Sequence, residues 1–195
     1  MDFLAFPKMP RLHRDIIVTE KLDGTNAQIC ITPEGAIFAG SRTRWITPED
    51  DNFGFARWVE ENKDELLQLG PGRHFGEWWG KGIQRGYGLQ ERRFSLFNTL
   101  RWGCEPQTSP TADPRVTRTQ DILPACCGLV PVLYEGPFHT EEIEQRLSWL
   151  KRLGSLAAPG FMNPEGVVVF HTAGNVAFKK TIEKDEMPKA LAQKE

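Results

Sequence analysis

Short strand-like stretches, separated by turn residues, recur along this chain and constrain its fold more than any other feature. Pro33, Glu34 and Gly35 form a short turn with hairpin chemistry between two of them, and a second hairpin is predicted near the C-terminus. The predicted strands are 16–19, 27–32, 36–40, 74–79, 94–98, 130–134, 166–171 and 175–181. Strands joined by tight turns pair in the antiparallel sense, so the sequence predicts mostly antiparallel sheets.

Two helices are expected between these strands. One runs over 53–69, where apolar residues can share a face, and a Gly-Pro-Gly segment ends it. The other runs over 140–153, with Thr140 as its N-terminal cap and Gly154 at its end. Because strands dominate and helices intervene irregularly, we predict an α+β fold. The Thr-, Pro- and Asp-rich stretch 103–124 is expected to be a surface excursion.

The length of 195 residues predicts a single domain over 1–195. With 39% hydrophobic and 26% charged residues, the composition is that of an ordinary soluble globular protein. No apolar run approaches the roughly 20 residues that span a bilayer, and the N-terminus lacks the apolar stretch of a signal peptide, so a cytoplasmic location is expected. The net charge of −2 excludes a globally basic coat, so any nucleic acid must be held by a local patch. The four cysteines lack the spacing of a zinc site.

The segment 20–26, Glu-Lys-Leu-Asp-Gly-Thr-Asn, is the most informative stretch for chemistry. Lys21 follows a strand and precedes Asp23 and Gly24, and the glycine permits a sharp turn. A lysine amine has an ordinary pKa of about 10.4 and is a poor nucleophile while it is protonated. It needs neighbouring cations, a metal ion or partial removal from water to lose the proton. Taken alone, the segment fits an exposed hairpin turn equally well, so the rest of the chain must decide.

Five more short motifs follow this segment in order. They are Ser41-Arg42-Thr43, Phe75-Gly76-Glu77, Phe94-Ser95-Leu96-Phe97, Glu165-Gly166-Val167-Val168 and Phe178-Lys179-Lys180. Their order resembles the covalent nucleotidyltransferases, the superfamily of DNA ligases, RNA ligases and mRNA capping enzymes. Glu20, Asn26 and the segment 76–84 are similar to the RNA ligase branch typified by the phage T4 enzyme that seals nicked double-stranded RNA. The resemblance covers 18–181 and implies the α+β, antiparallel-sheet, ATP-grasp-like nucleotidyltransferase domain of that superfamily.

The resemblance also implies a covalent mechanism. Lys21 would attack the α-phosphate of ATP, expel pyrophosphate and hold AMP through a phosphoramidate bond. Asp23, Glu77 and Glu165 would hold the water shell of a hydrated Mg²⁺, for which Mn²⁺ can substitute. The bound metal ion would neutralise charge on the phosphate that is transferred.

Other residues are implied to bind the nucleotide. Glu20 would contact the amino edge of adenine, while Asn26 and Arg42 would contact ribose or phosphate. Phe97 would stack on adenine opposite Val168. A core role is the ordinary alternative for an aromatic residue in a strand, so the stacking assignment depends on the resemblance alone.

The chain departs from the pattern of this branch at two places. Lys179 or Lys180 would neutralise the phosphates as charge builds up in the transition state. The branch has Lys-x-Lys here, whereas Thr181 follows the two lysines of this chain, so either Lys180 or Thr181 takes the second position. Asn98 stands where an aspartate is customary.

From the resemblance we predict an ATP-dependent RNA ligase that joins 5′-phosphate and 3′-hydroxyl ends through lysyl-AMP and an adenylylated RNA end. RNA ends or nicked duplexes are the expected substrates, and NAD⁺ stays open as an alternative donor of AMP. The chain ends soon after Lys180, so we expect a minimal ligase without an accessory C-terminal domain, or one that relies on a partner subunit to grip the nucleic acid.

Two other functions stay open. One is a capping-type guanylyltransferase, which Asn26 disfavours, and the other is a non-catalytic module that binds RNA ends or nucleotides. A run of arginines fits either contact with a phosphate backbone or a solvated charged face. This run consists of Arg85, Arg92, Arg93 and Arg101.

Overall fold

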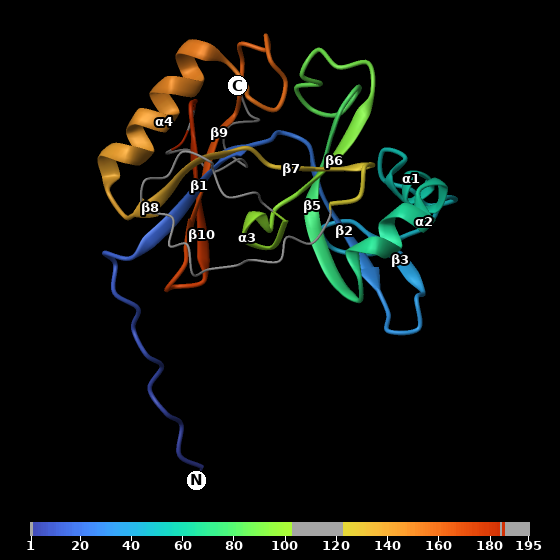
Figure 1. Cartoon of the computed structure of the whole chain (residues 1–195), viewed down its shortest axis with the longest axis horizontal. Helices are drawn as coiled ribbons and strands as arrows, with labels where there is room; N and C mark the ends of the chain where they lie inside the picture. The colour runs from blue at the N-terminus through green and yellow to red at the C-terminus, as the bar shows by residue number, and fades with distance from the viewer. Residues whose placement is uncertain (1, 103–122, 184, 186–195) are drawn as a thin grey trace, which may run out of the picture. The chain divides into compact units, whose positions relative to one another are not determined.

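The structure is a computed structural model that describes residues 2–102, 123–183 and 185. The chain divides into two compact units, one of Met1–Lys21 with Pro131–Glu195 and one of Leu22–Val130 (Figure 1). Each unit has its own sheet and its own buried core. The prediction of one domain over 1–195 stays a prediction, and most of the predicted surface excursion at 103–124 lies outside the described residues. Within the described ranges, no helix has the length and apolar character needed to cross a membrane.

The first unit is built on a four-stranded antiparallel sheet in the order β10-β9-β1-β8. Its strands are β1 (Asp15–Lys21), β8 (Val132–Pro137), β9 (Gly166–His171) and β10 (Val176–Thr181). β1 has a neighbour on each side, and its residues 16–20 are all buried. The predicted hairpin of 166–171 with 175–181 is confirmed.

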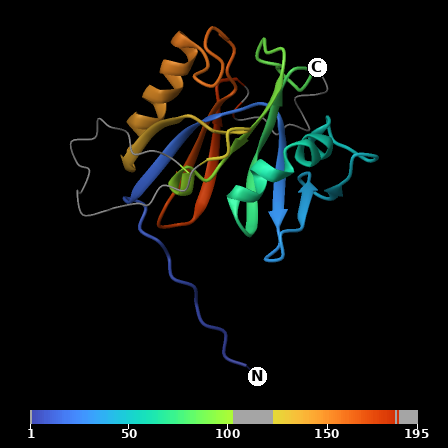
Figure 2. The same cartoon turned by 45° about the vertical axis from the view of Figure 1, so that its right-hand side comes forward.

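Helix α4 (Thr140–Leu153) covers one face of this sheet (Figures 1 and 2). The core between them consists of Ile16, Val18, Leu147, Leu150, Val167 and Val169. The predicted bounds of the helix and its end at Gly154, where φ is 85°, are confirmed. The predicted cap is wrong, because His139 occupies the N-cap position and no side chain among the described residues caps the helix there. Two glutamates in the first turn offer negative charge to the free N–H groups instead.

The second unit is built on a six-stranded sheet in the order β4-β3-β2-β5-β6-β7, antiparallel except for the β6–β7 pair. Its strands are β2 (Thr25–Ile31), β3 (Ile37–Gly40), β4 (Trp45–Ile46), β5 (Gly72–Gly80), β6 (Arg92–Leu96) and β7 (Cys127–Leu129). Its helices are α1 (Phe55–Glu61), α2 (Lys63–Leu66), the 3₁₀-helix η1 (Leu67–Leu69) and α3 (Thr99–Trp102). The predicted α+β class with mostly antiparallel pairing is confirmed.

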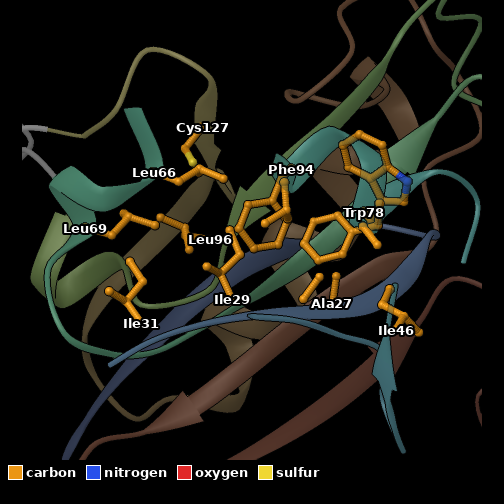
Figure 3. Close-up of a cluster of buried hydrophobic side chains, with 14 of the residues drawn as sticks. Ala27, Ile29, Ile31, Ile46, Leu66, Leu69, Trp78, Phe94, Leu96 and Cys127 are labelled. Carbon is orange, nitrogen blue, oxygen red and sulfur yellow. The ribbon is translucent and has the colours of Figure 1, made fainter. Parts of the chain in front are cut away.

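The core of the second unit lies on one face of this sheet. Figure 3 shows its side chains meeting from strands and helices, among them Ala27, Ile29, Ile31, Ile46, Leu66, Leu69, Trp78, Phe94, Leu96 and Cys127. Successive side chains of a strand point to opposite faces, so Asn26 and Gln28 of β2 lie on the face away from this core. The candidate binding residues of β2 and β5 are on that second face, because Asn26 is the cross-strand partner of Glu77.

Two predicted elements have other bounds in the structure than the sequence predicts. The helix expected over 53–69 breaks at Asn62, where φ is −108°. The side-chain amide of Asn62 donates to the Trp58 carbonyl at 2.8 Å, a local bond of the kind that competes with helix continuation. The strand expected over 130–134 is confirmed for residues 132–134, but its start is wrong, because β7 ends before Val130 and β8 begins after Pro131. Pro131 has no N–H to donate to a strand ladder, and the chain passes here from the sheet of one unit to the sheet of the other.

Candidate active site

Lys21 is the last residue of β1, the strand that is flanked by β8 and β9. Its Nζ lies 2.6 Å from Oε2 of Glu165, which directly precedes β9. The Lys21 side chain is 20% exposed and that of Glu165 is 6% exposed. A protonated amine has no lone pair for attack, and Glu165 lies at hydrogen-bond distance from Nζ, where it positions Lys21 and can take a proton from it.

The strand register decides which residues share a face with Lys21. Cross-strand partners lie on the same face, and residues two apart along a strand do so as well. Thr19, two residues before Lys21, pairs with Val168, and Val168 pairs with Lys179. The structure therefore brings Lys21, Val168 and Lys179 to one face of the first sheet.

Lys180 follows Lys179 in β10, so its side chain lies on the opposite face of the first sheet. Its Nζ forms an ion pair with Oε1 of Glu144 on α4, at 2.7 Å. Thr181, and not Lys180, has the register of Lys21, because both residues are partners of Gly166. The Thr181 hydroxyl donates to the Glu183 carbonyl at 2.9 Å. The structure thus does not bring Lys180 together with Lys21, although the sequence placed both in the catalytic set.

Glu20 is almost fully buried, with 1% of its surface exposed. Its Oε2 accepts hydrogen bonds from the backbone N–H groups of Leu156 (2.8 Å) and Ala157 (3.1 Å) in the loop after α4. Burial raises the pKa of the Glu20 carboxyl, and hydrogen bonds from Ser155 and these two N–H groups oppose the rise. Among the described residues, Oε1 of Glu20 has no hydrogen-bond partner. Buried acceptors in folded proteins are paired with a protein donor, an ordered water or a ligand, so Oε1 is available to a donor from a ligand.

Two residues of the loop after β5, Arg85 and Tyr87, form hydrogen bonds with Asp23 in the turn that follows Lys21. Asp23 accepts a hydrogen bond from Nε of Arg85 at 3.0 Å, and its own backbone N–H donates to the Tyr87 hydroxyl at 2.8 Å. The sequence assigns Arg85 either to contact with a phosphate backbone or to a solvated charged face, and it does not predict that Arg85 and Tyr87 bind Asp23. The sequence signal for this contact is the glycine-rich composition around Tyr87, which predicts a tight loop. Tyr87 has a φ of 53°, which is uncommon for a residue other than glycine.

Glu77 fixes the same turn from β5. Its Oε1 accepts the backbone N–H of Gly24 at 3.0 Å, and its Oε2 lies 3.4 Å from Nδ2 of Asn26. Gly24 has no room for a side chain, because a Cβ there would meet the Trp78 carbonyl oxygen and lie 2.7 Å from Cβ of Trp79. Glu77 therefore links Asn26 to the turn that contains Asp23, and all three predicted residues belong to the second unit.

Arg42 and Phe97 are accessible to a ligand. Arg42 is exposed in the turn between β3 and β4. Phe97 directly follows β6 with 40% of its surface exposed, and its backbone N–H donates to the Phe75 carbonyl at 2.9 Å. Both residues belong to the second unit, as do Asn26 and Glu77.

The arginine run is largely engaged within the protein. Arg92 donates to backbone carbonyls, Arg93 pairs with Glu91, and the Arg101 guanidinium lies 4.4 Å from the Trp102 ring centroid. Arg85 pairs with Asp23, as described above. These contacts favour a structural role over a free phosphate-binding row.

The three carboxylates predicted to hold a metal ion are divided between hydrogen-bonded groups. Glu165 pairs with Lys21 in the first unit, while Asp23 and Glu77 have their partners in the second. Within the part of the chain that the structure describes, no three His, Cys, Asp or Glu side chains gather as a metal-ion site. Their chemistry still suits Mg²⁺, which prefers oxygen ligands and keeps several of its waters.

The fold is the α+β nucleotidyltransferase fold of the RNA ligase superfamily, as solved structures show. An archaeal ATP-dependent RNA ligase superposes with a TM-score of 0.56 at 18% identity, over 92% of this chain and 48% of that chain. The Naegleria gruberi RNA ligase, in a lysine-to-methionine variant with AMP and Mn, gives 0.53 at 19% identity, over 94% and 52%. An alanine variant of the same ligase with ATP and Mn gives 0.52 at 17% identity, with the same coverage of both chains. At this level of identity the likeness is one of fold alone.

The family follows from the sequence as a whole. The RNA ligase family model matches residues 14–184, and this chain belongs to the RNA ligase family. The chain spans about half the length of the solved structures that it matches. No curated protein matches it significantly in sequence. The finer resemblance to the branch typified by the phage T4 enzyme stays a prediction.

Proposed function

We propose that this chain is an ATP-dependent RNA ligase that stores AMP on Lys21 and uses it to join RNA ends. Membership of the RNA ligase family supports the reaction class. The observation that carries the proposal is the Lys21–Glu165 pair, in which a partly exposed amine is held 2.6 Å from a buried carboxylate. A nucleophile held in one place and still accessible loses little orientational freedom when a phosphate approaches.

The reaction has three steps, each with one bond made and one broken at phosphorus. First, Nζ of Lys21 gives up a proton and bonds to the α-phosphorus of ATP, while the bond to the bridging oxygen breaks and pyrophosphate leaves. Second, a 5′-phosphate oxygen of RNA bonds to the same phosphorus, the P–N bond breaks and Lys21 takes a proton back. Third, the 3′-hydroxyl oxygen loses its proton and bonds to the 5′-phosphate, and AMP leaves.

Glu20 provides base recognition in this proposal. Its buried Oε1 is an acceptor without a donor among the described residues, and the exocyclic amino group of adenine is a donor of the required kind. Guanine has a keto oxygen where adenine has this amino group, so guanine would place an acceptor against Oε1, which is itself an acceptor. The proposal therefore favours ATP over GTP and disfavours the capping-type alternative.

Lys179 is assigned to the phosphates because it shares the sheet face of Lys21. Its ammonium would neutralise negative charge that builds up as pyrophosphate leaves. Lys180 receives no such role, since it pairs with Glu144 on the other face. The resemblance further assigns Val168 to the base.

The assignments in the second unit rest on the resemblance and on exposure. Asn26 and Arg42 would contact ribose or phosphate, and Phe97 would stack on adenine with its exposed ring. The resemblance assigns Asp23, Glu77 and Glu165 to a divalent cation such as Mg²⁺ or Mn²⁺, which prefers oxygen ligands. When bound, the cation neutralises charge on the transferring phosphate. Structures of the Naegleria ligase contain Mn together with AMP or ATP.

The test is whether the chain becomes covalently labelled. The purified protein is incubated with Mg²⁺ and ATP labelled at its α-phosphorus, denatured in detergent and separated on a gel. We expect label on the wild type and on a Lys151→Ala control, which removes an exposed lysine of α4, but none on Lys21→Ala. The label should resist alkali and be released by acid, as a phosphoramidate is, and pass to 5′-phosphorylated RNA when this is added.

Other outcomes separate the alternatives. Labelling by GTP and not by ATP would support a guanylyltransferase. Absence of label with ATP, GTP and NAD⁺ would refute the enzyme and leave a non-catalytic binding module. Equal labelling of Lys21→Ala would place the adduct on another residue.

A further inference from the structure

The second unit exposes three aromatic rings on the sheet face away from its core. Phe38, Trp45 and Phe75 have 50%, 48% and 51% of their surfaces exposed. They come from three strands, β3, β4 and β5. We call the surface formed by Gln28, Phe38, Trp45, Arg73 and Phe75 the aromatic platform.

The strand register makes the platform continuous. Trp45 is the partner of Gly40, Gly40 of Gln28, and Gln28 of Phe75, so these residues form one row across four strands. Phe38 and Arg73 are both partners of Cys30 and form the next row. The rings of Phe38 and Trp45 have centroids 6.0 Å apart. Gly40 has no side chain, and the side chain of Gln28 lies against its backbone: a Cβ at Gly40 would lie 2.7 Å from Cγ of Gln28.

Arg73 gives the platform a positive charge. Its guanidinium carbon lies 5.3 Å from the Trp45 ring centroid, and its Nη1 donates to Oε1 of Gln28 at 3.0 Å. Within the described residues it forms no ion pair with a carboxylate. Exposed aromatic rings grouped in this way usually mark an interaction site, and a cation among them favours an anionic partner.

The platform continues from residues that the proposed function assigns to the nucleotide. Gln28 and Phe75 lie two positions along β2 and β5 from Asn26 and Glu77, a distance of about 7 Å on the same face. Phe75 is also hydrogen-bonded through its carbonyl to the backbone of Phe97. A chain of nucleotides that starts near these residues could run onto the platform without leaving this face.

We propose that the aromatic platform binds single-stranded RNA, with bases stacked on Trp45 and Phe75 and a phosphate or base held by Arg73. The choice of RNA rests on the proposed function. Unpaired bases offer flat π-faces to aromatic side chains, and such stacking tolerates any sequence. A blunt duplex hides these faces inside its own stack, so the platform selects single strands over duplexes.

The test measures RNA binding by the full chain in the absence of ATP. A short, 5′-phosphorylated single-stranded RNA with a fluorophore at its 3′ end is titrated with protein, and anisotropy is recorded. The same RNA annealed to its complement is the second probe. The variants are Trp45→Ala and Phe75→Ala, with Trp45→Phe as the conservative change and Phe3→Ala as the control, because Phe3 is 92% exposed in the other unit.

We expect each platform alanine variant to bind the single strand at least about fivefold more weakly, since one stacked base contributes about 1–3 kcal/mol. Trp45→Phe and Phe3→Ala should bind like the wild type, and duplex binding should not change. Equal loss of single-strand and duplex binding would overturn the proposal, as would unchanged RNA affinity in both alanine variants. Unchanged affinity with loss of a dimer in sedimentation would show a protein interface instead.

Labelling of Lys21 separates this inference from the proposed function. The platform variants are half-exposed substitutions and should accept AMP from ATP as the wild type does. Normal labelling with unchanged RNA affinity would refute the platform alone. Absent labelling of the wild type, with RNA affinity still lost in Trp45→Ala, would refute the proposed function alone.

Discussion

Replacing Glu20 by glutamine tests how the base is recognised. In the wild type, Oε2 accepts two backbone N–H groups at 2.8 and 3.1 Å, and Oε1 is an acceptor without a partner among the described residues. The amide of glutamine has only one oxygen. That oxygen must take the Oε2 position, because an NH₂ group there would face two donors. The Glu20→Gln variant therefore presents a donor where the wild type presents an acceptor.

The magnitude follows from the hydrogen bonds exchanged. The variant loses a charge-assisted bond to the adenine amino group, which contributes about 1.5–3 kcal/mol. It gains a neutral bond of about 0.5–1.5 kcal/mol to a purine with a keto oxygen at the same place, as in ITP. At about 1.4 kcal/mol for each tenfold change, the preference for ATP over ITP should fall at least about 30-fold.

The assay compares the initial rate of Lys21 labelling by ATP and ITP, each labelled at the α-phosphorus and below saturation. The wild type should prefer ATP, and Glu20→Gln should move the preference towards ITP. A Glu20→Ala variant, which has neither donor nor acceptor, is expected to lose ATP labelling without gaining ITP labelling. An unchanged ratio in Glu20→Gln would refute the assignment of Oε1 to the base.

Stability gives a second readout that needs no nucleotide. Burial raises the pKa of Glu20 above its ordinary value of 4.5, so the folded chain holds this proton more tightly than the unfolded chain. The contribution of Glu20 to stability is therefore full below pH 4.5 and is lost as the pH rises through the raised pKa. Glutamine does not titrate, so Glu20→Gln should remove this loss. In urea titrations, the difference in free energy of unfolding between variant and wild type should therefore be more favourable to the variant at neutral pH than at acid pH. A variant that is less stable than the wild type at neutral pH would contradict the reasoning.

Four other predictions follow from the geometry. Gly24→Ala should destabilise the chain by about 1–3 kcal/mol, measured as a lower urea midpoint, because the new Cβ meets the backbone of β5. Leu150→Ala should cost about 2–5 kcal/mol in the same assay, since this side chain is 0% exposed. Lys179→Ala should slow Lys21 labelling far more than Lys180→Ala, which removes only a partly exposed ion pair; equal losses would contradict the strand register. Burial lowers the pKa of His74 from its ordinary 6.5, so its contribution to stability is present above pH 6.5 and is lost as the pH falls; His74→Gln should lack this slope in urea titrations across that range.

The sequence determined the α+β class and most of the strands. The alternating burial in β2 and the tight turn at residues 33–35 are local features. Each depends on residues that are neighbours in the chain, so the sequence alone predicts them. The bounds of helix α4 were predictable for the same reason, because a glycine at its end is a local signal. The ordered motifs around Lys21, Glu77 and Glu165 likewise indicated the family, because their residue types and their order along the chain are properties of the sequence alone.

Tertiary structure decided which of these residues meet. Oε2 of Glu20 accepts hydrogen bonds from the backbone N–H groups of Leu156 and Ala157, and these donors have no signature in the sequence. Only the register of β9 with β10 turns Lys179 towards the face of Lys21 and Lys180 towards α4, because a shift of one residue reverses the face of every side chain in a strand. The sequence therefore determined the chemistry that is available, and the tertiary structure decided its arrangement, because contacts between residues far apart in the chain are set by strand pairing and packing.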